Sequence, residues 1–224
     1  MAIKGKLVLF RHGQTPYNKL HYMTGLHDVP LTEEGEEQAR NCGRSIGEAG
    51  IVIDKAYAST LMRAFNTASL ALEASGNNDQ LKNADGTWNI EKRPEIVEAD
   101  SGDFTARNKL TDPEILAFPH KYDIPLPNGE SDKQMVERVQ KFYDEELMPR
   151  LLRGETVLVA SHSGIMVAFE VVTGIREVPE GDIWSNRHGV PNASPVVYEY
   201  EDGKLTKNYQ LGAPAARKDA GPKP

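Results

Sequence analysis

Short apolar runs alternate with longer amphipathic segments along this chain, and the alternation limits the folds it can adopt. Residues 6–10, 51–58 and 155–160 have the composition of buried strands. Helices are expected to follow from Thr32 to Gly47 or Gly50, and from a cap at Ser59 through Leu72. Strands alternating with helices predict an α/β fold, a three-layer α/β/α sandwich with a mostly parallel central sheet.

The remaining segments fit the same plan. The sequence predicts a loop over 76–94 with a short strand near 88–90, and helices over 111–118, from Ser131 onward and over 164–173. Strand-like segments at 195–200 and 204–210 flank Asp202-Gly203, which predicts a terminal hairpin. We expect one catalytic domain over residues 1–211 and a mobile tail over 212–224.

Composition narrows the choice of partners. The 26 lysines and arginines against 33 aspartates and glutamates give a net charge of −7, which argues against nucleic acid and anionic membranes as partners. No apolar run is long enough to span a bilayer, and the N-terminus does not resemble a signal peptide. The single cysteine, Cys42, excludes an internal disulfide and is expected to serve packing, which favours a cytoplasmic protein. An anionic ligand would therefore need a local basic pocket.

Three predicted strand-to-helix junctions could build that pocket. They carry Arg11-His12-Gly13, Ser59 to Arg63, and Ser161-His162-Ser163-Gly164. Ligands of open α/β sheets bind beyond the carboxyl ends of the strands. If the three strands are parallel and adjacent, two histidines and two arginines converge there, and the helix after His162 aims backbone N–H groups at the same place. Such a cluster suits a phosphate dianion.

These residue types also suit phosphoryl transfer. A neutral imidazole nitrogen is a competent nucleophile toward phosphorus. Arginines neutralise the phosphoryl oxygens during in-line transfer, and their planar fork bonds those oxygens in pairs. A carboxylic acid would still be needed to protonate the leaving oxygen and then to activate water.

The motifs resemble those of the histidine phosphatase superfamily. Residues 11–18, from Arg11-His12-Gly13 to Asn18, match its R-H-G-[EQ]-[ST]-x-x-N signature, and Ser59 to Arg63 matches its S-x-x-x-R element. Residues 24–35 and 160–164 resemble its loop with the following helix and its second-histidine turn. The chain end, 195–199 and 209–212, is most similar to the cofactor-dependent phosphoglycerate mutases, which implies a phosphoglycerate-mutase-like fold.

The resemblance implies roles for the matching positions. His12 would be the nucleophile that becomes phosphohistidine, and Glu98 would be the proton donor. Arg11, Arg63 and His162 would grip the phosphoryl group. The remaining matches would assist or line the pocket rim: Asn18, Gln14, Thr15, Thr24, Gly25 and Ser163. No metal and no nucleotide is implied, and histidines 21, 27, 120 and 188 lack metal-ligand spacing.

Departures from the mutase branch favour hydrolysis. Mutases follow the acid with Arg-x-Tyr, where this chain has Ala99-Asp100-Ser101, and His120-Lys121 stands where mutases carry two arginines. A mutase segment after Pro127 is shortened, and residues 191–194 look more like the phosphatase branch. Arg107, Lys109 and Lys121 form either a cationic rim or plain surface charge.

The expected activity is thus hydrolysis of a small phosphorylated metabolite, with no cofactor. One alternative is a phosphoglycerate mutase dependent on 2,3-bisphosphoglycerate, and another is an inactive phosphate-binding protein. The resemblance is also compatible with a homodimer.

Overall fold

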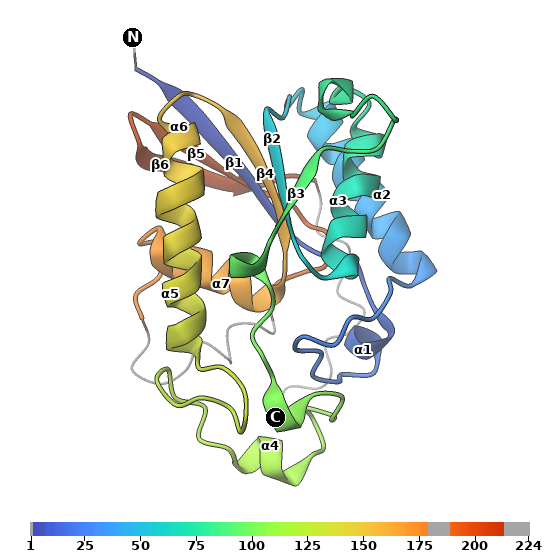
Figure 1. The fold of residues 1–224 in the computed structure, drawn as a ribbon, viewed down its shortest axis with the longest axis vertical. Coiled ribbons are helices and arrows are strands. Elements are labelled where there is room, and N and C mark those ends of the chain that lie inside the picture. Colours follow the sequence, from blue (N-terminus) through green and yellow to red (C-terminus); the bar gives the residue numbers. More distant parts are fainter. Residues whose placement is uncertain (1, 179–188, 213–224) are drawn as a thin grey trace.

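Six strands form one central sheet in the order β3-β2-β4-β1-β5-β6 (Figure 1). The computed structural model describes residues 2–178 and 189–212. Strands β3, β2, β4 and β1 run parallel to one another. Strand β5 pairs antiparallel with β1, and β6 pairs antiparallel with β5. The expected mostly parallel sheet is confirmed. The strands are β1 (Lys4–Arg11), β2 (Lys55–Ser59), β3 (Ile90–Arg93), β4 (Thr156–Ser161), β5 (Val196–Glu201) and β6 (Lys204–Gln210).

Helices cover both faces of the sheet, as a three-layer sandwich requires (Figure 1). One layer holds α2 (Glu33–Glu48) and α3 (Met62–Ser75), and the other holds α5 (Asp132–Phe142), α6 (Met148–Leu151) and α7 (Ser163–Val172). A π-helical turn, η4 (Tyr143–Leu147), joins α5 to α6. The short helices α1 (Pro16–Lys19) and α4 (Pro113–Ala117), and the 3₁₀ turns η1 (Asp79–Leu81), η2 (Pro94–Ile96) and η3 (Gly102–Phe104), lie in connections.

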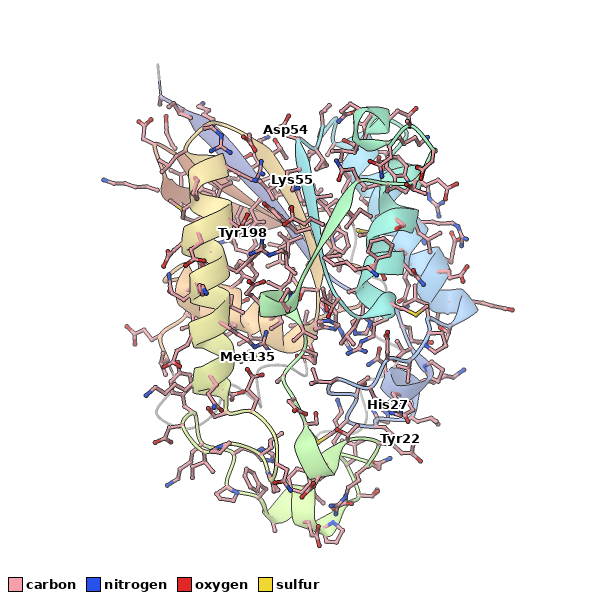
Figure 2. The ribbon with its side chains drawn as sticks, viewed as in Figure 1. Tyr22, His27, Asp54, Lys55, Met135 and Tyr198 are labelled. Carbon is pink, nitrogen blue, oxygen red and sulfur yellow. The ribbon has the colours of Figure 1, made fainter. Side chains whose placement is uncertain are left out.

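Alternation along each strand divides the core into two layers. In β1, Leu7 and Leu9 belong to the cluster that includes α5 and α7, whereas Val8 and Phe10 belong to the cluster that includes α2 and α3. Successive side chains of a strand point to opposite faces, so a strand covered on both sides must be apolar throughout. Met135 of α5 and Tyr198 of β5 both belong to the first cluster and are labelled in Figure 2.

One predicted helix start was wrong. Ser59 is the last residue of β2 and does not cap a helix, because α3 begins at Met62. The Met62 amide donates to Asp28 at 2.9 Å, so a distant loop supplies the acceptor at this helix start. The predicted strand over 51–58 also begins later, at Lys55, since the Ile53 amide donates to the Asn78 side chain.

Other elements agree with the sequence. Ser131 forms the expected capping box with Gln134, and the hairpin turns at Asp202 and Gly203, both with positive φ. Within the two described stretches, no helix is both long and apolar enough to cross a membrane. The expected mobile tail, apart from Gly212, lies outside the described residues.

Glycines allow α2 and α3 to pack backbone against backbone. A Cβ added at Gly43 would lie 2.1 Å from the Ala71 carbonyl oxygen, and one at Gly47 would lie 2.2 Å from that of Ser75. Neither carbonyl oxygen can withdraw without moving α3. The helix pair therefore depends on the absence of side chains at these positions.

Gly43→Ala is expected to destabilise the protein by about 1–3 kcal/mol, because the added methyl group overpacks a backbone contact. Helix propensity alone would predict the opposite sign, since alanine is better than glycine inside a helix by about 1 kcal/mol. Urea unfolding measures the difference, with Glu48→Ala on α2 as the control expected to change stability little. A stabilised Gly43→Ala variant would contradict the packing argument.

Candidate active site

The three strand-to-helix junctions meet at one edge of the sheet. Strands β2, β4 and β1 are neighbours and parallel, so their carboxyl ends bring together Ser59, His162 and the Arg11-His12 pair. The rings of His12 and His162 pack edge to face with centroids 5.2 Å apart. His27 and Tyr22 lie beyond this end of the sheet, and Asp54 and Lys55 lie at the other (Figure 2).

Two hydrogen bonds orient the His12 ring. Its Nδ1 lies 2.7 Å from the Gly13 carbonyl oxygen, so Nδ1 carries the proton, and Nε2 accepts from the Nε of Arg63 at 3.3 Å. Burial, with Arg63 and Arg11 nearby, holds the pKa of His12 well below its usual value. His12 is therefore a neutral imidazole with its lone pair on Nε2.

The loop that carries His12 is clamped by tight contacts. A Cβ at Gly13 would lie 2.2 Å from the carbonyl oxygen of Gly35 on α2. The Gly13 amide donates to the Thr67 hydroxyl of α3 at 3.0 Å. Both helices of one layer therefore hold the loop.

Arg63 is fully buried, and each nitrogen of its guanidinium donates one hydrogen bond. Besides its contact with His12, it donates to the carbonyl oxygens of His27 at 2.8 Å and Gly25 at 3.0 Å. Burial lowers the pKa of Arg63 to about 10, while the nearby Glu98 and Asp28 oppose this shift, so the side chain stays cationic at neutral pH. Gly25 thus takes part through its backbone.

His162 and Arg11 each keep a buried nitrogen without a partner. Within residues 2–178 and 189–212, Nδ1 of His162 and Nε of Arg11 make no hydrogen bond. Burial and the arginine charges hold the pKa of His162 well below its usual value. Buried polar atoms are nearly always satisfied, so unpartnered nitrogens beside two guanidinium groups indicate a site for an anion.

The Ser59 hydroxyl indicates which ring nitrogen of His162 carries the proton. Its hydroxyl lies 2.7 Å from Nε2 of His162 and also accepts the Leu61 amide at 3.2 Å. Among the residues that the structure describes, Nε2 is the one acceptor recorded for the Ser59 hydroxyl proton, so we assign that proton to the bond with Nε2 and the ring proton to Nδ1. The unpartnered Nδ1 is then a donor that faces the anion site.

Glu98 stands at the border of this cluster. Its Oε1 accepts the Ala99 amide at 3.0 Å, and its Oε2 accepts the Ser163 hydroxyl at 3.3 Å. Its negative charge acts on Arg11, on Arg63 and on Lys109. Glu98 is thus the carboxylate that faces the cationic cluster.

The three candidate rim cations differ in their surroundings. Burial and the nearby Arg11 charge, opposed by Glu98, lower the pKa of Lys109 to about 8, so Lys109 lies close to the site. Arg107 instead forms ion pairs with Asp112 and Glu114. Lys121 is exposed and lines a different hollow with Glu130 and Asp132.

The remaining candidates serve mainly to build the loop. The hydroxyl of Thr15 caps α1 in a capping box with Asn18, and Gln14 Oε1 accepts from the Thr32 hydroxyl at 3.1 Å. The Gln14 and Thr15 side chains thus take part in local structure, and their place at the pocket rim stays a prediction. The Thr24 carbonyl oxygen accepts the His27 amide at 3.0 Å, in the loop that Arg63 holds.

The sequence interpretation missed two contributors. Asn192 donates to the His12 carbonyl oxygen at 2.8 Å and to Asn18 Oδ1 at 3.4 Å. Thr67 accepts the Gly13 amide and donates to the Arg63 carbonyl oxygen at 2.6 Å. Among the described residues no group of three or more His, Cys, Asp or Glu is arranged to hold a metal ion.

Comparison with known proteins identifies the family. Residues 7–209 match the model of the histidine phosphatase superfamily, branch 1, so the chain belongs to that superfamily, as its motifs predicted. It is 35% identical over 202 residues to a 2,3-bisphosphoglycerate-dependent phosphoglycerate mutase of Parvibaculum lavamentivorans, covering 88% of this chain and 90% of that protein.

Solved structures on both sides of the family share the fold. A phosphoglycerate mutase from Bacillus anthracis superimposes with a TM-score of 0.71 and 25% identity, covering 92% of each chain. A mycobacterial glucosyl-3-phosphoglycerate phosphatase superimposes with a TM-score of 0.68 and 22% identity, covering 88% of this chain and 90% of that one. The expected phosphoglycerate-mutase-like fold is confirmed. Enzymes of this family include both mutases and phosphatases.

Ser59→Ala is expected to weaken binding of inorganic phosphate about tenfold, since a lost hydrogen bond to a buried group costs about 1–3 kcal/mol. Calorimetric titration measures the affinity, and ¹⁵N NMR of the His162 ring reports which nitrogen carries the proton. Ser69→Ala, on α3, is the matched control. An Nε2-protonated ring in the unmodified protein would contradict the assignment.

The two buried neutral histidines also predict that the free energy of unfolding falls at acidic pH. The pKa values of His12 and His162 are lowered in the folded protein, so below about pH 6.5 the unfolded chain binds protons that the folded chain does not. Stability is full above that pH and is lost as pH falls, by up to about 1.4 kcal/mol per pH unit for each histidine.

Urea unfolding between pH 7.5 and 5 in phosphate-free buffer tests this dependence. His162→Gln should lose stability less steeply than the unmodified protein, whereas His21→Asn, outside the site, should follow the unmodified slope. Equal slopes for all three proteins would refute the assignment.

Proposed function

We propose that this protein hydrolyses small phosphomonoesters through a phosphohistidine on His12. The proposal rests on one observation. Two buried nitrogens without a partner, Nδ1 of His162 and Nε of Arg11, lie beside the Nε2 lone pair of His12, where they could bind a phosphoryl group. The two guanidinium groups balance the charge of a phosphate dianion.

The first step transfers the phosphoryl group. Nε2 of His12 attacks phosphorus while the bond from phosphorus to the ester oxygen breaks. Glu98, as the acid, gives its proton to the departing oxygen, and an alcohol leaves. Arg11, Arg63 and His162 hold the equatorial oxygens as charge shifts among them. The fixed Nδ1–H···O=C bond to Gly13 keeps the attacking nitrogen unprotonated.

The second step restores the enzyme. Glu98, now a carboxylate, takes a proton from water, and the oxygen of that water attacks the phosphohistidine. The bond from nitrogen to phosphorus breaks, inorganic phosphate is released, and His12 returns to its neutral form. In this pathway no cofactor takes part.

A second candidate is a mutase that uses 2,3-bisphosphoglycerate, as the name of the Parvibaculum relative suggests. That relative has about the length of this chain, so a short segment after Pro127 is no argument against mutase activity. Lys109 adds a cation near Arg11, which is also compatible with phosphoglycerate.

Hydrolysis is favoured because the site has few cations that could bind a second anionic group of the substrate, such as the carboxylate or second phosphate of a phosphoglycerate. Asp100 and Ser101 occupy the region where mutases carry Arg-x-Tyr, and Lys121 lies in a different hollow. Retaining a bisphosphorylated intermediate requires cations that match its charges.

The test compares phosphate release from p-nitrophenyl phosphate and other monoesters with conversion of 3-phosphoglycerate, each with and without 2,3-bisphosphoglycerate. We expect phosphate release that His12→Ala abolishes and Glu98→Gln lowers by about 10²–10⁴-fold, the usual contribution of a general acid. Acid-labile ³²P trapped on His12 would mark the intermediate. Isomerisation that requires the bisphosphate would favour the mutase. Tight phosphate binding without turnover would leave only a binding protein.

A further inference from the structure

A cavity of about 270 Å³ adjoins the anion site on the side of Glu98. Glu98 belongs to both, because it lines the cavity and its charge acts on Arg11 and Arg63. The buried, unpartnered nitrogens of His162 and Arg11 independently mark where the phosphoryl group lies. In the proposed reaction the leaving group is bonded to that phosphoryl group and takes its proton from Glu98, so it must extend past Glu98. The cavity is the space that Glu98 borders on that side.

Carboxylates dominate the polar wall of the cavity. Glu98, Asp100 and Glu130 line it, with Arg138 as the one cation among its lining residues. Arg138 is already paired: Nε and Nη2 donate to Glu130 at 2.7 and 2.9 Å, and Nη1 donates to the Glu95 carbonyl oxygen at 2.6 Å. Its positive charge is thus offset by the Glu130 carboxylate.

Asp100 offers a hydrogen-bond acceptor to the cavity. One of its oxygens accepts the Gly102 amide at 2.9 Å, and the other has no hydrogen bond among the residues that the structure describes. Lys109 does not line the cavity and lies instead near Arg11. Gln134 also lines the cavity, and its Oε1 accepts the Ser131 amide at 2.9 Å. Apart from the Gln134 amide nitrogen and the paired Arg138, the polar wall presents acceptors and negative charge.

An apolar wall stands beside the carboxylates. Leu26 and Val97 line the cavity, and Leu26 is 43% exposed. Because Leu26 follows Gly25, whose carbonyl oxygen Arg63 holds, its backbone is fixed next to the anion site. The two walls suit a short carbon skeleton that bears hydrogen-bond donors.

We propose that the natural substrate is a phosphomonoester whose leaving group carries hydroxyl or ammonium groups next to the ester oxygen and no carboxylate. This inference rests on the proposed hydrolysis and names the substrate class of the same site. Hydroxyl and ammonium groups share the relevant chemistry, since both donate to carboxylates, and ammonium also pairs with their charge. A carboxylate in this cavity would meet like charges without a free cation.

Four substrates test the inference on the full-length protein: p-nitrophenyl phosphate, glycerol 1-phosphate, phosphoethanolamine and 3-phosphoglycerate. We expect kcat/KM for glycerol 1-phosphate or phosphoethanolamine to exceed that for 3-phosphoglycerate at least tenfold. The better of the first two tells whether hydroxyl or ammonium is preferred. A preference for 3-phosphoglycerate would overturn the inference.

The Asp100→Asn variant tests whether the substrate preference arises from the wall of this cavity. The change removes one negative charge from the wall, so the ratio of kcat/KM for phosphoethanolamine to that for 3-phosphoglycerate should fall about tenfold. Asp103→Asn is the matched control, since Asp103 is exposed, does not line the cavity and bonds Asn128. An unchanged ratio in Asp100→Asn would overturn the assignment to this cavity.

The two proposals fail in different ways. If p-nitrophenyl phosphate, which carries neither a donor nor a carboxylate, is not hydrolysed, the proposed function fails. If it is hydrolysed by a route that needs His12 but the donor-bearing esters are not preferred to 3-phosphoglycerate, hydrolysis stands and the inference about the leaving group falls.

Discussion

The buried guanidinium of Arg63 is the interaction on which the rest of the site depends. It joins β1, α3 and the loop at residues 25–27 through its contacts with His12, Gly25 and His27. A cation at a helix N-terminus is opposed by the helix dipole, and burial adds a further cost. Carbonyl oxygens and the charges of Glu98 and Asp28 offset that cost, and a bound dianion would offset it further. The site is thus organised around an incompletely balanced positive charge.

A shared fold does not decide the outcome of the reaction. The relatives with solved structures include a mutase and a phosphatase that share this fold, so the fold alone does not decide the reaction. The proposed leaving-group region of this chain lies beyond Glu98. In this chain that region contains Asp100, Glu130 and an Arg138 that is already paired. In the proposed reaction, His12 and the arginines would serve the chemistry at phosphorus, and the wall beyond Glu98 would select the leaving group.

Local patterns in the sequence predicted most of the fold and the centre of the site. Continuous apolar runs marked β1 and β4, and the Ser131 capping box marked the start of α5, because both signals lie within a few residues. Contacts between distant residues could not be predicted in this way. Asn192 supports a histidine loop 180 positions earlier in the sequence. Ser59 resembled a helix cap, yet its hydroxyl bonds His162, 103 positions away. Burial, which no pattern revealed, is what separates Lys109 from Arg107.

The contact between Gly13 and Gly35 has a mechanical consequence. Backbone touches backbone there, and Gln14 is bonded to both Thr32 and Gln38 of the same helical segment. The nucleophile loop and α2 must therefore move as one rigid unit, without a hinge between them. Any opening that admits a substrate would have to come from the opposite side, where the residues after Glu98 form the wall. The rigid side, with Gly13 and α2, would keep the geometry of attack constant. The residues after Glu98 could then vary in sequence with the alcohol that is released.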